Sequence, residues 1–261
     1  MTPFFFGEPS RRLFGAYHPA ATSRGRQRAA VLCYPWGPEY VEAHRTLRQL
    51  AETLAGAGIH ALRFDYFGTG DSGGTLAEGG VPGWRSDILT AAEELCDISG
   101  AERVSLVGLR LGALLAMAAA VEAPSRLDRL VLLDPVVDGA VYLDELAALA
   151  RIEGNLSMEP VPRPPERGGG VELFGMPVTG QQAAEFEGLA VAPLAARLRT
   201  QAKLVVSGEY EALATARAAV GPALSGDARH VPATPYWVDH RLLAPGPIPV
   251  AVLRAVAELL E

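Results

Sequence analysis

The sequence predicts an α/β fold with a mostly parallel sheet and helices on both of its faces. Short apolar runs such as Ala29–Tyr34 and Arg103–Val107 are typical of buried strands. Longer segments between them, such as Val41–Gly56, carry apolar residues at helical spacing. Repeated strand–helix–strand crossovers build a parallel sheet, and ligands bind beyond the carboxyl ends of its strands.

The amino-terminal part supplies a hairpin and then two strand–helix units. We expect Thr2–Phe6 and Leu13–Tyr17 to pair antiparallel across a turn that contains Gly, Pro and Ser. Ala29–Tyr34 is the next strand, and in the helix that follows Gly56 marks the end of the apolar periodicity. The second unit consists of a strand at Ile59–Tyr66 and a helix at Trp84–Ile98.

The remaining elements continue the alternation, with one interruption. The predicted strands are Arg103–Val107, Arg129–Leu133 and Lys203–Ser207, and the predicted helices are Leu111–Ala123 and Ile248–Leu260. The alternation breaks at residues 139–199, which include the Pro- and Gly-rich linker Glu159–Gly170. We interpret this stretch as an inserted lid with a mobile hinge, and a disordered surface insertion is the alternative. The core then consists of residues 1–138 and 200–261.

Composition excludes several classes of protein. The net charge of −7 argues against a nucleic-acid coat, because phosphate binding needs a basic surface. Two cysteines cannot build a disulfide scaffold or a four-cysteine zinc site, and they suit a reducing, cytoplasmic compartment. The chain lacks an uncharged apolar stretch of about 18 residues, and its first residues do not have the charge order of a signal peptide. We expect no membrane span, no cofactor and no metal.

The turn after Ile59–Tyr66 contains two known patterns at once. Gly68, Gly70 and Gly73 fit the dinucleotide fingerprint, which requires a helix that begins inside it, and here Gly79, Gly80 and Pro82 delay the helix. Residues 70–74 also spell the GDSGG run of trypsin-like proteases, which belongs to a two-barrel β fold. The third interpretation is a tight structural turn in which glycines adopt positive φ and Asp71 or Ser72 bonds locally.

A second glycine motif lies between the Arg103–Val107 strand and the Leu111–Ala123 helix. Gly108 and Gly112 flank Arg110 in the order G-x-Nu-x-G, the pattern of a nucleophile elbow. Such a turn projects its central residue over the sheet end, where helix amides can hold an oxyanion. Arg110 is a guanidinium that stays protonated, so it cannot act as a nucleophile.

These motifs together resemble the α/β-hydrolase superfamily, specifically its bacterial serine-aminopeptidase-like (S33-type) branch. The resemblance is carried by Arg63–Ser72, which follows an R-x-D-x-x-G-x-G-x-S pattern, by Gly108–Gly112 and by the front hairpin. It implies a mostly parallel sheet of about eight strands with a lid after strand six. In one subgroup of this branch another segment replaces the usual His-Gly oxyanion loop, and Pro35–Arg45 resembles that replacement. Arg110 departs from the family pattern, which puts acyl-enzyme hydrolysis in doubt.

The resemblance also indicates where an acid and a base would lie. Asp134 follows the Arg129–Leu133 strand and suits an acid after strand six, whereas Glu209 and Glu211 suit one after strand seven. The base would come from a late loop, where His240 is better placed than His230, although a solvated surface histidine is the alternative.

Arg110 needs a partner because a cation at a helix N-terminus is unfavourable. An internal carboxylate, from Asp134, Asp65 or Glu39, would make a structural salt bridge. An external anion or a polarised carbonyl would make a binding site.

The loop and first helical turn after Ala29–Tyr34 face the same pocket in this fold. Tyr40 and His44 are four residues apart, so they share a helix face and could do acid–base work beside Arg110. A solvated helix start is the alternative. We expect the surrounding side chains to contact a substrate: Trp36, Glu39, Arg45, Leu109 and Leu111.

Three functions are therefore open. The first is an enzyme acting on an acyl, ester or amide-like small molecule, in which Arg110 stabilises an anionic group and His44, Tyr40 or His240 handles protons. The second is a catalytically inactive pseudo-hydrolase that binds a ligand or partner. The third is a nucleotide-binding redox protein that uses Gly68–Gly73. The expected partner is a small molecule, anionic if Arg110 binds it directly, and the sequence does not predict the oligomeric state.

Overall fold

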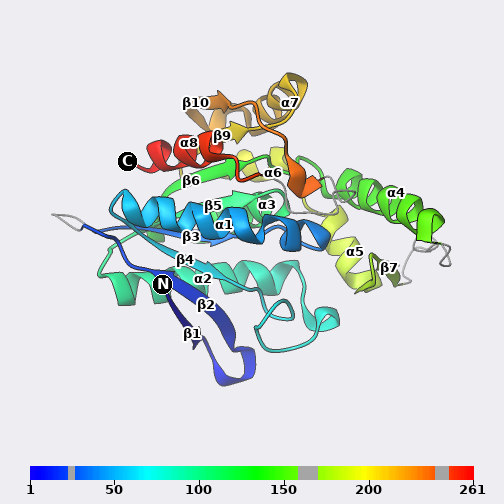
Figure 1. Ribbon diagram of the computed structural model, residues 1–261, viewed down its shortest axis with the longest axis horizontal. Helices are drawn as coiled ribbons and strands as arrows, with labels where there is room; N and C mark the ends of the chain where they lie inside the picture. Colours follow the sequence, from blue (N-terminus) through cyan, green and yellow to red (C-terminus); the bar gives the residue numbers. More distant parts are fainter. Residues whose placement is uncertain (23–26, 158–169, 239–246) are drawn as a thin grey trace.

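The computed structural model describes residues 1–22, 27–157, 170–238 and 247–261 (Figure 1). Its main sheet has eight strands in the order β1-β2-β4-β3-β5-β6-β9-β10. The strands are β1 (Thr2–Phe6), β2 (Leu13–His18), β3 (Arg28–Cys33), β4 (Ile59–Phe64), β5 (Val104–Leu109), β6 (Leu127–Leu133), β9 (Ala202–Val206) and β10 (Leu224–His230). The predicted front hairpin is confirmed, with Phe5 paired antiparallel to Phe14.

From β4 to β10 the neighbouring strands run parallel, and β2 joins them antiparallel through β4. The central strands β3 and β5 are almost entirely buried, because helices cover both faces of a parallel sheet. Their sequences are accordingly continuous apolar runs without alternation. This arrangement brings the carboxyl ends of β3, β5, β6 and β9 to one edge of the sheet.

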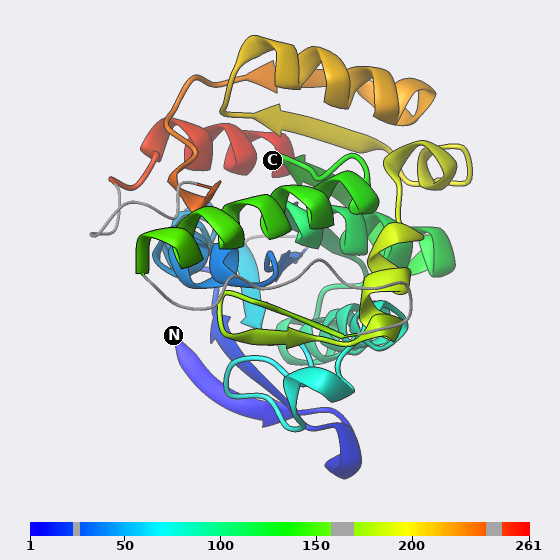
Figure 2. The same cartoon turned by 90° about the vertical axis from the view of Figure 1, so that its right-hand side faces the viewer.

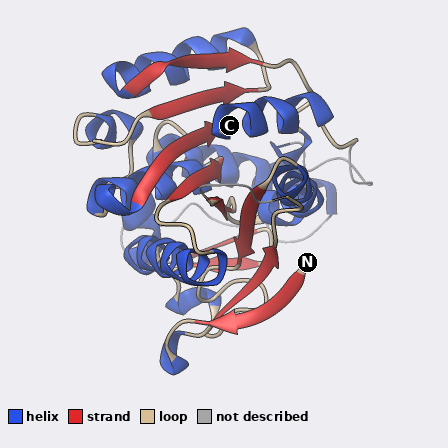
Figure 3. Cartoon of the chain, turned by 90° about the vertical axis from the view of Figure 1, so that its left-hand side faces the viewer, coloured by secondary structure: helices blue, strands red, loops and turns tan. Residues whose placement is uncertain are grey.

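Helices pack on both faces of the sheet's centre (Figure 3). α1 (Pro38–Gly56) and α8 (Val250–Leu260) contact one another on one face, and α2 (Val81–Ser99) and α3 (Leu111–Glu122) on the other. α3 is buried at each of its first ten residues, which its alanine content permits. α7 (Tyr210–Val220) packs on β9 and β10. Short 3-10 turns lie at Pro9–Arg11, Leu76–Glu78, Pro124–Arg126, Gly221–Ala223 and Tyr236–Val238.

Residues 139–199, called the inserted segment from here on, form ordered elements where the structure describes them. They are α4 (Gly139–Ser157), the hairpin β7 (Val171–Leu173) and β8 (Met176–Val178), α5 (Gly180–Glu187) and α6 (Val191–Ala195). Figure 2 shows α4 crossing the end of the molecule where the carboxyl ends of the strands lie. Most of the predicted hinge, Glu159–Gly170, falls outside the described residues.

The observed boundaries differ from the predicted ones in a few places. α1 begins at Pro38, three residues earlier than expected, because proline suits the first helical position. β10 and α7 were absent from the predicted elements. β10 has the polar sequence LSGDARH, which an edge strand with a single neighbour tolerates.

Candidate functional site

The turn from β5 to α3 places Arg110 in a strained conformation. Arg110 has φ 54° and ψ −121°, a region that non-glycine residues rarely adopt. A Cβ on Gly108 would lie 2.4 Å from Ala113 Cα, and one on Gly112 would lie 2.3 Å from the carbonyl oxygens of Cys33 and Tyr34. Both glycines are therefore required by close backbone approach, and together they project Arg110 from the sheet end.

The Arg110 guanidinium is paired inside the protein. Its Nε donates to Oε1 of Glu39 at 3.0 Å, and the other carboxylate oxygen of Glu39 accepts from the Tyr142 hydroxyl at 3.1 Å. Its Nη1 lies 3.5 Å from the backbone oxygen of Asp134, and its Cζ lies 5.7 Å from the centre of the Tyr142 ring. Arg110 thus meets one of the three carboxylates that the sequence offered, and α4 contributes the third member of the group.

Burial shapes the electrostatics of this group. Glu39 is 1% exposed and the Arg110 side chain 18% exposed. Burial raises the pKa of the Glu39 carboxyl above its ordinary value, while the ion pair with Arg110 and the hydrogen bond from Tyr142 oppose that rise. The positive charge of Arg110 is therefore compensated before any ligand arrives.

Asp134 lies beside this group at the end of β6. Its Oδ1 accepts from the Ser207 amide at 2.7 Å and its Oδ2 from the Ser207 hydroxyl at 2.5 Å. Burial raises the pKa of Asp134, and hydrogen bonds from Ser207 and Trp237 counteract part of that rise. Glu209 and Glu211 are exposed at the start of α7. Of the three acid candidates, Asp134 is therefore the one placed next to Arg110.

Two pockets adjoin Arg110. The first, the Trp237 pocket, has a volume of about 150 Å³ and is lined by Arg110, Asp134 and Trp237 together with apolar side chains that include Val206, Ala216 and Val238. The second, the Tyr142 pocket, has a volume of about 350 Å³ and is lined by Arg110, Tyr142, Asp138, Glu145 and Thr215 among others. Arg110, Pro135 and Ala212 line both pockets. A ligand at Arg110 therefore has an apolar space on one side and a more polar one on the other.

Tyr40 and His44 share a face of α1, as their spacing predicted, but that face does not meet Arg110. Tyr40 donates to Oδ1 of Asp65 at 2.8 Å, and the exposed His44 ring lies 6.0 Å from the Tyr34 ring. Neither residue lines the Trp237 or Tyr142 pocket. Successive helical residues point about 100° apart, so Glu39 reaches Arg110 while Tyr40 turns to Asp65. Tyr40 and His44 therefore do not lie beside Arg110, contrary to the expected grouping.

The other predicted site residues lie in several environments. Trp36 is buried and packs edge-on against Phe186 of α5, at a centroid distance of 5.4 Å. Leu109 and Leu111 are fully buried core residues, because one ends the central strand and the other begins α3. Arg45 is exposed on α1. His240 lies outside the described residues.

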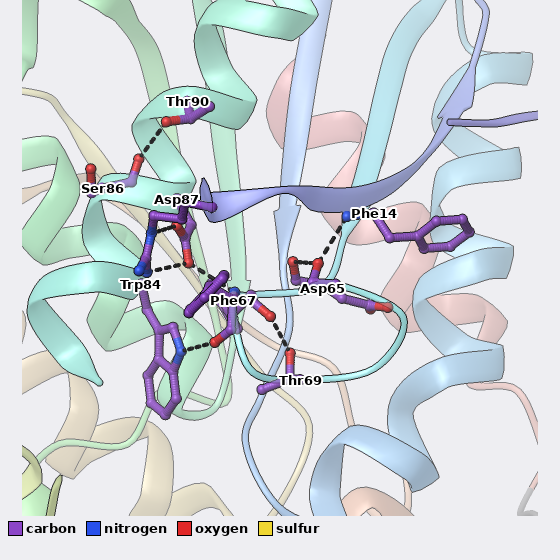
Figure 4. A network of polar contacts seen from close by, with 11 residues as sticks. Phe14, Asp65, Phe67, Thr69, Trp84, Ser86, Asp87 and Thr90 are labelled. Atoms are coloured by element: carbon purple, nitrogen blue, oxygen red, sulfur yellow. Dashed lines mark hydrogen bonds and ion pairs between the residues drawn. The ribbon is translucent and has the colours of Figure 1, made fainter. Parts of the chain in front are cut away.

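The glycine-rich turn after β4 is a structural turn, held both by hydrogen bonds within it and by one from β2, where only local bonds were expected (Figure 4). The Ser72 hydroxyl donates to the Asp65 carbonyl at 2.6 Å and accepts from the Phe14 amide at 2.8 Å. The Asp71 amide donates to the Asp65 carboxylate at 2.9 Å. The next α-helix, α2, begins only at Val81, so its amides do not face this turn as a dinucleotide site would need.

Trp84 and Asp87 secure the same turn from α2. The Trp84 indole donates to the Phe67 carbonyl at 3.0 Å, and Asp87 accepts from the Phe67 amide at 2.9 Å and from Arg11 at 2.6 Å (Figure 4). These contacts make Trp84 a core residue and Asp87 a structural carboxylate.

Sequence reasoning missed three residues of the site: Tyr142, Ser207 and Trp237. Tyr142 lies four residues after Asp138, which accepts from the Ala140 and Val141 amides and so fixes the first turn of α4. That aspartate was the available signal for a helix start. Within the described ranges, no three His, Cys, Asp or Glu side chains are grouped to bind a metal ion. None of the described helices is both long and apolar enough to cross a bilayer.

Comparison with known proteins agrees with this architecture. The family model described as serine aminopeptidase, S33, matches residues 38–164. The chain is 39% identical over 80 residues to rat palmitoyl-protein thioesterase ABHD10, mitochondrial, a match that covers 31% of this chain and 26% of the rat protein. The bovine protein of that name is 36% identical over 106 residues, covering 40% and 33%. The chain thus matches about a third or less of the length of these relatives.

Among solved structures, Est1E from Butyrivibrio proteoclasticus with bound ferulic acid superimposes with a TM-score of 0.65 at 16% identity. That superposition covers 98% of this chain and 96% of Est1E. The chain therefore has the α/β-hydrolase fold, and its residues 38–164 are similar to the serine aminopeptidase, S33, family.

Proposed function

We propose that this chain binds the neutral acyl group of a small molecule at Arg110 and forms no acyl-enzyme there. The proposal is supported by the Gly108–Gly112 turn, which lies between β5 and α3, where a nucleophile elbow would lie, and has Arg110 at its centre. The observation that carries the proposal is the Arg110–Glu39 ion pair, 3.0 Å long and buried. A guanidinium that is protonated and already paired cannot attack a carbonyl carbon, but its remaining N–H groups can donate to a carbonyl oxygen.

The charges around Arg110 favour a neutral group at the guanidinium over an anionic one. The Glu39 carboxylate pairs with the guanidinium, and the Asp134 carboxyl group is near enough to interact with it electrostatically. A carboxylate or phosphate ligand would meet their repulsion as well as the attraction of Arg110. The Trp237 pocket adds mostly apolar walls, and an apolar cavity of about 150 Å³ holds a group of about six carbons. A short acyl chain with its carbonyl at Arg110 fits both features.

A second candidate function is hydrolysis of an acyl compound, which the sequence match to thioesterases favours. In that case Arg110 would polarise the acyl carbonyl, and Asp134, which lines the Trp237 pocket, would be a described group able to hold a proton. Water would then replace the serine as the attacking group. The compartment in which either function operates is a prediction from the two cysteines, and the names of the relatives point to mitochondria instead.

One experiment separates the two functions. Hexanamide binding is measured by calorimetry, and hydrolysis of a short and a long acyl thioester is measured in parallel, for the native chain, Arg110→Gln and Arg45→Gln. Arg45 is the control because it is an exposed arginine on α1. Binding that Arg110→Gln abolishes, without turnover, supports a binding protein. Turnover that Arg110→Gln abolishes and Arg45→Gln leaves intact supports the hydrolase.

The variant Arg110→Ser probes the elbow directly. No histidine is among the described residues that line either pocket, so a serine at this position would lack a base from them. We therefore expect no esterase activity. Clear ester hydrolysis by Arg110→Ser would contradict this expectation and show that a base reaches the turn.

A further inference from the structure

We propose that the ligand also carries a positively charged group, which lies in the Tyr142 pocket while the acyl chain lies in the Trp237 pocket. This inference rests on the proposed function, because it places the acyl carbonyl at Arg110. It defines the ligand class as a short acyl derivative of an amine that bears a second, cationic centre.

The first step is the position of Arg110 between two spaces. Arg110, Pro135 and Ala212 line both pockets, so a carbonyl at the guanidinium has one substituent in each direction. The Trp237 pocket is the smaller and more apolar of the two, at about 150 Å³ against about 350 Å³. The acyl chain belongs in the smaller pocket, and the other half of the molecule belongs in the Tyr142 pocket.

The second step is the charge of the Tyr142 pocket. Asp138 and Glu145 line it from the start of α4, and Arg110 is its only cation among the described lining residues. Arg110 is engaged by Glu39, which lies behind it and is 1% exposed. Apart from Arg110, no described residue that lines the pocket carries a positive charge to balance Asp138 and Glu145, and a cation placed there is attracted to both carboxylates.

The third step is the availability of those carboxylates. Glu145 is exposed and forms no salt bridge within the part of the chain that the structure describes. It is near enough to Glu39 and Tyr142 that its charge raises the pKa values of both groups. Asp138 is held in place by the amides of Ala140 and Val141 at 2.9 and 3.1 Å. One carboxylate is thus fixed and the other is free to adjust to a ligand.

The alternatives fit this pocket less well. An anionic group would be repelled by Glu145 and Asp138, and a purely apolar group would bury their carboxylates without a partner. A hydroxyl or amide group could hydrogen-bond to them but would gain no ionic attraction. An ammonium group supplies three donors and the complementary charge.

The test uses three hexanoyl amides that differ only in their second half. N-hexanoyl-ethylenediamine is cationic at pH 7, N-(2-hydroxyethyl)hexanamide is neutral and N-hexanoylglycine is anionic. Calorimetry at low and at high salt measures their affinities for the native chain, for Glu145→Gln and for Asp144→Asn. Asp144 is the matched control, because it is an exposed acid one residue away on α4 that lines neither pocket.

We expect the cationic amide to bind roughly two- to fivefold more tightly than the neutral one, and the anionic amide to bind weakest. Glu145→Gln should remove most of that preference, Asp144→Asn should preserve it, and high salt should reduce it. Equal affinities for the cationic and neutral amides would overturn this inference and leave the proposed function standing. Binding of none of the three would overturn both.

Discussion

Arg110 and Glu39 are 71 residues apart in sequence and form a buried ion pair, with Nε 3.0 Å from Oε1. Removing one partner of such a pair leaves an uncompensated charge, which is more costly than removing both. We expect Glu39→Gln to destabilise the fold by about 3–5 kcal/mol, measured by urea unfolding at pH 7. The double variant Glu39→Gln/Arg110→Met should be more stable than Glu39→Gln alone. A Glu39→Gln variant as stable as the native chain would contradict the pairing.

The β5–α3 turn depends on Gly112 for a steric reason. A Cβ there would lie 2.3 Å from two carbonyl oxygens, so Gly112→Ala should cost about 3 kcal/mol or more. Gly56 is the matched control: it ends α1, and a Cβ there meets nothing within 4 Å. Gly56→Ala should be neutral or stabilise by up to about 1 kcal/mol. Thermal unfolding of both variants measures the contrast, and similar effects at the two glycines would refute it.

Tyr142 links α4 to the Arg110 group through a single hydroxyl. Tyr142→Phe keeps the ring and removes the donor to Glu39 Oε2, so we expect a loss of about 1.5–3 kcal/mol, the range for a hydrogen bond to a charged group. Hydrogen exchange should become faster in α4 and stay unchanged in α2, which does not contact this hydroxyl. Unchanged exchange in α4 would show that the hydroxyl does not hold the helix.

The strand–helix alternation predicted the fold because its signal is local. β3 and β5 are continuous apolar runs, and each predicted strand of the core lies within a few residues of an observed one. β10 was not predicted because its sequence is polar and contains no apolar run. An edge strand with one neighbour tolerates such residues. In the inserted segment, β7, β8, α5 and α6 were not predicted because elements of three to eight residues are too short for periodicity to show, whereas α4, with 19 residues, was missed despite its length.

The sequence predicted the β5–α3 turn of the candidate site but not the residues that surround Arg110. The spacing of Gly108, Arg110 and Gly112 indicates a backbone bend that needs glycine on both sides, because a Cβ at either position would meet backbone atoms within 2.4 Å. The partners of Arg110 come from α1 and α4, far away in the chain, and sequence offered three carboxylates without a means of choosing among them. The partner of Arg110 depends on which face of α1 points to the carboxyl end of the sheet. Glu39 contacts Arg110, whereas Tyr40, the next residue, contacts Asp65 instead.

Ser72 provides a test of the structural interpretation of the GDSGG run. Its hydroxyl bonds to the Asp65 carbonyl and the Phe14 amide, so Ser72→Ala leaves a backbone donor without its acceptor. We expect a loss of about 1–3 kcal/mol in unfolding free energy and no change in ligand affinity at Arg110. Ser86→Ala, at an exposed serine on α2, should change stability by less than about 0.5 kcal/mol. Loss of a hydrolytic activity with unchanged stability would instead indicate a catalytic serine.

His18 gives the fold a dependence on pH that can be isolated. Burial, and then the neighbouring Arg63, lower the pKa of His18 from 6.5 to about 4, and its Nε2 accepts from Arg63 Nε at 3.3 Å. The folded state therefore binds fewer protons than the unfolded state between these values, so stability is fully present above about pH 6.5 and declines as the pH falls towards 4. Because solvent screens part of the shift, we expect a loss of roughly 1–2 kcal/mol.

The variant His18→Gln keeps an acceptor for Arg63 and removes the titration. Urea unfolding of both proteins at several pH values between 4 and 7 gives the difference in stability as a function of pH. Other acids titrate equally in the two proteins, so the difference reports His18 alone. The native chain should lose stability relative to His18→Gln as the pH falls, because only its unfolded state gains a proton at this position. A pH-independent difference would show that His18 titrates normally in the folded protein.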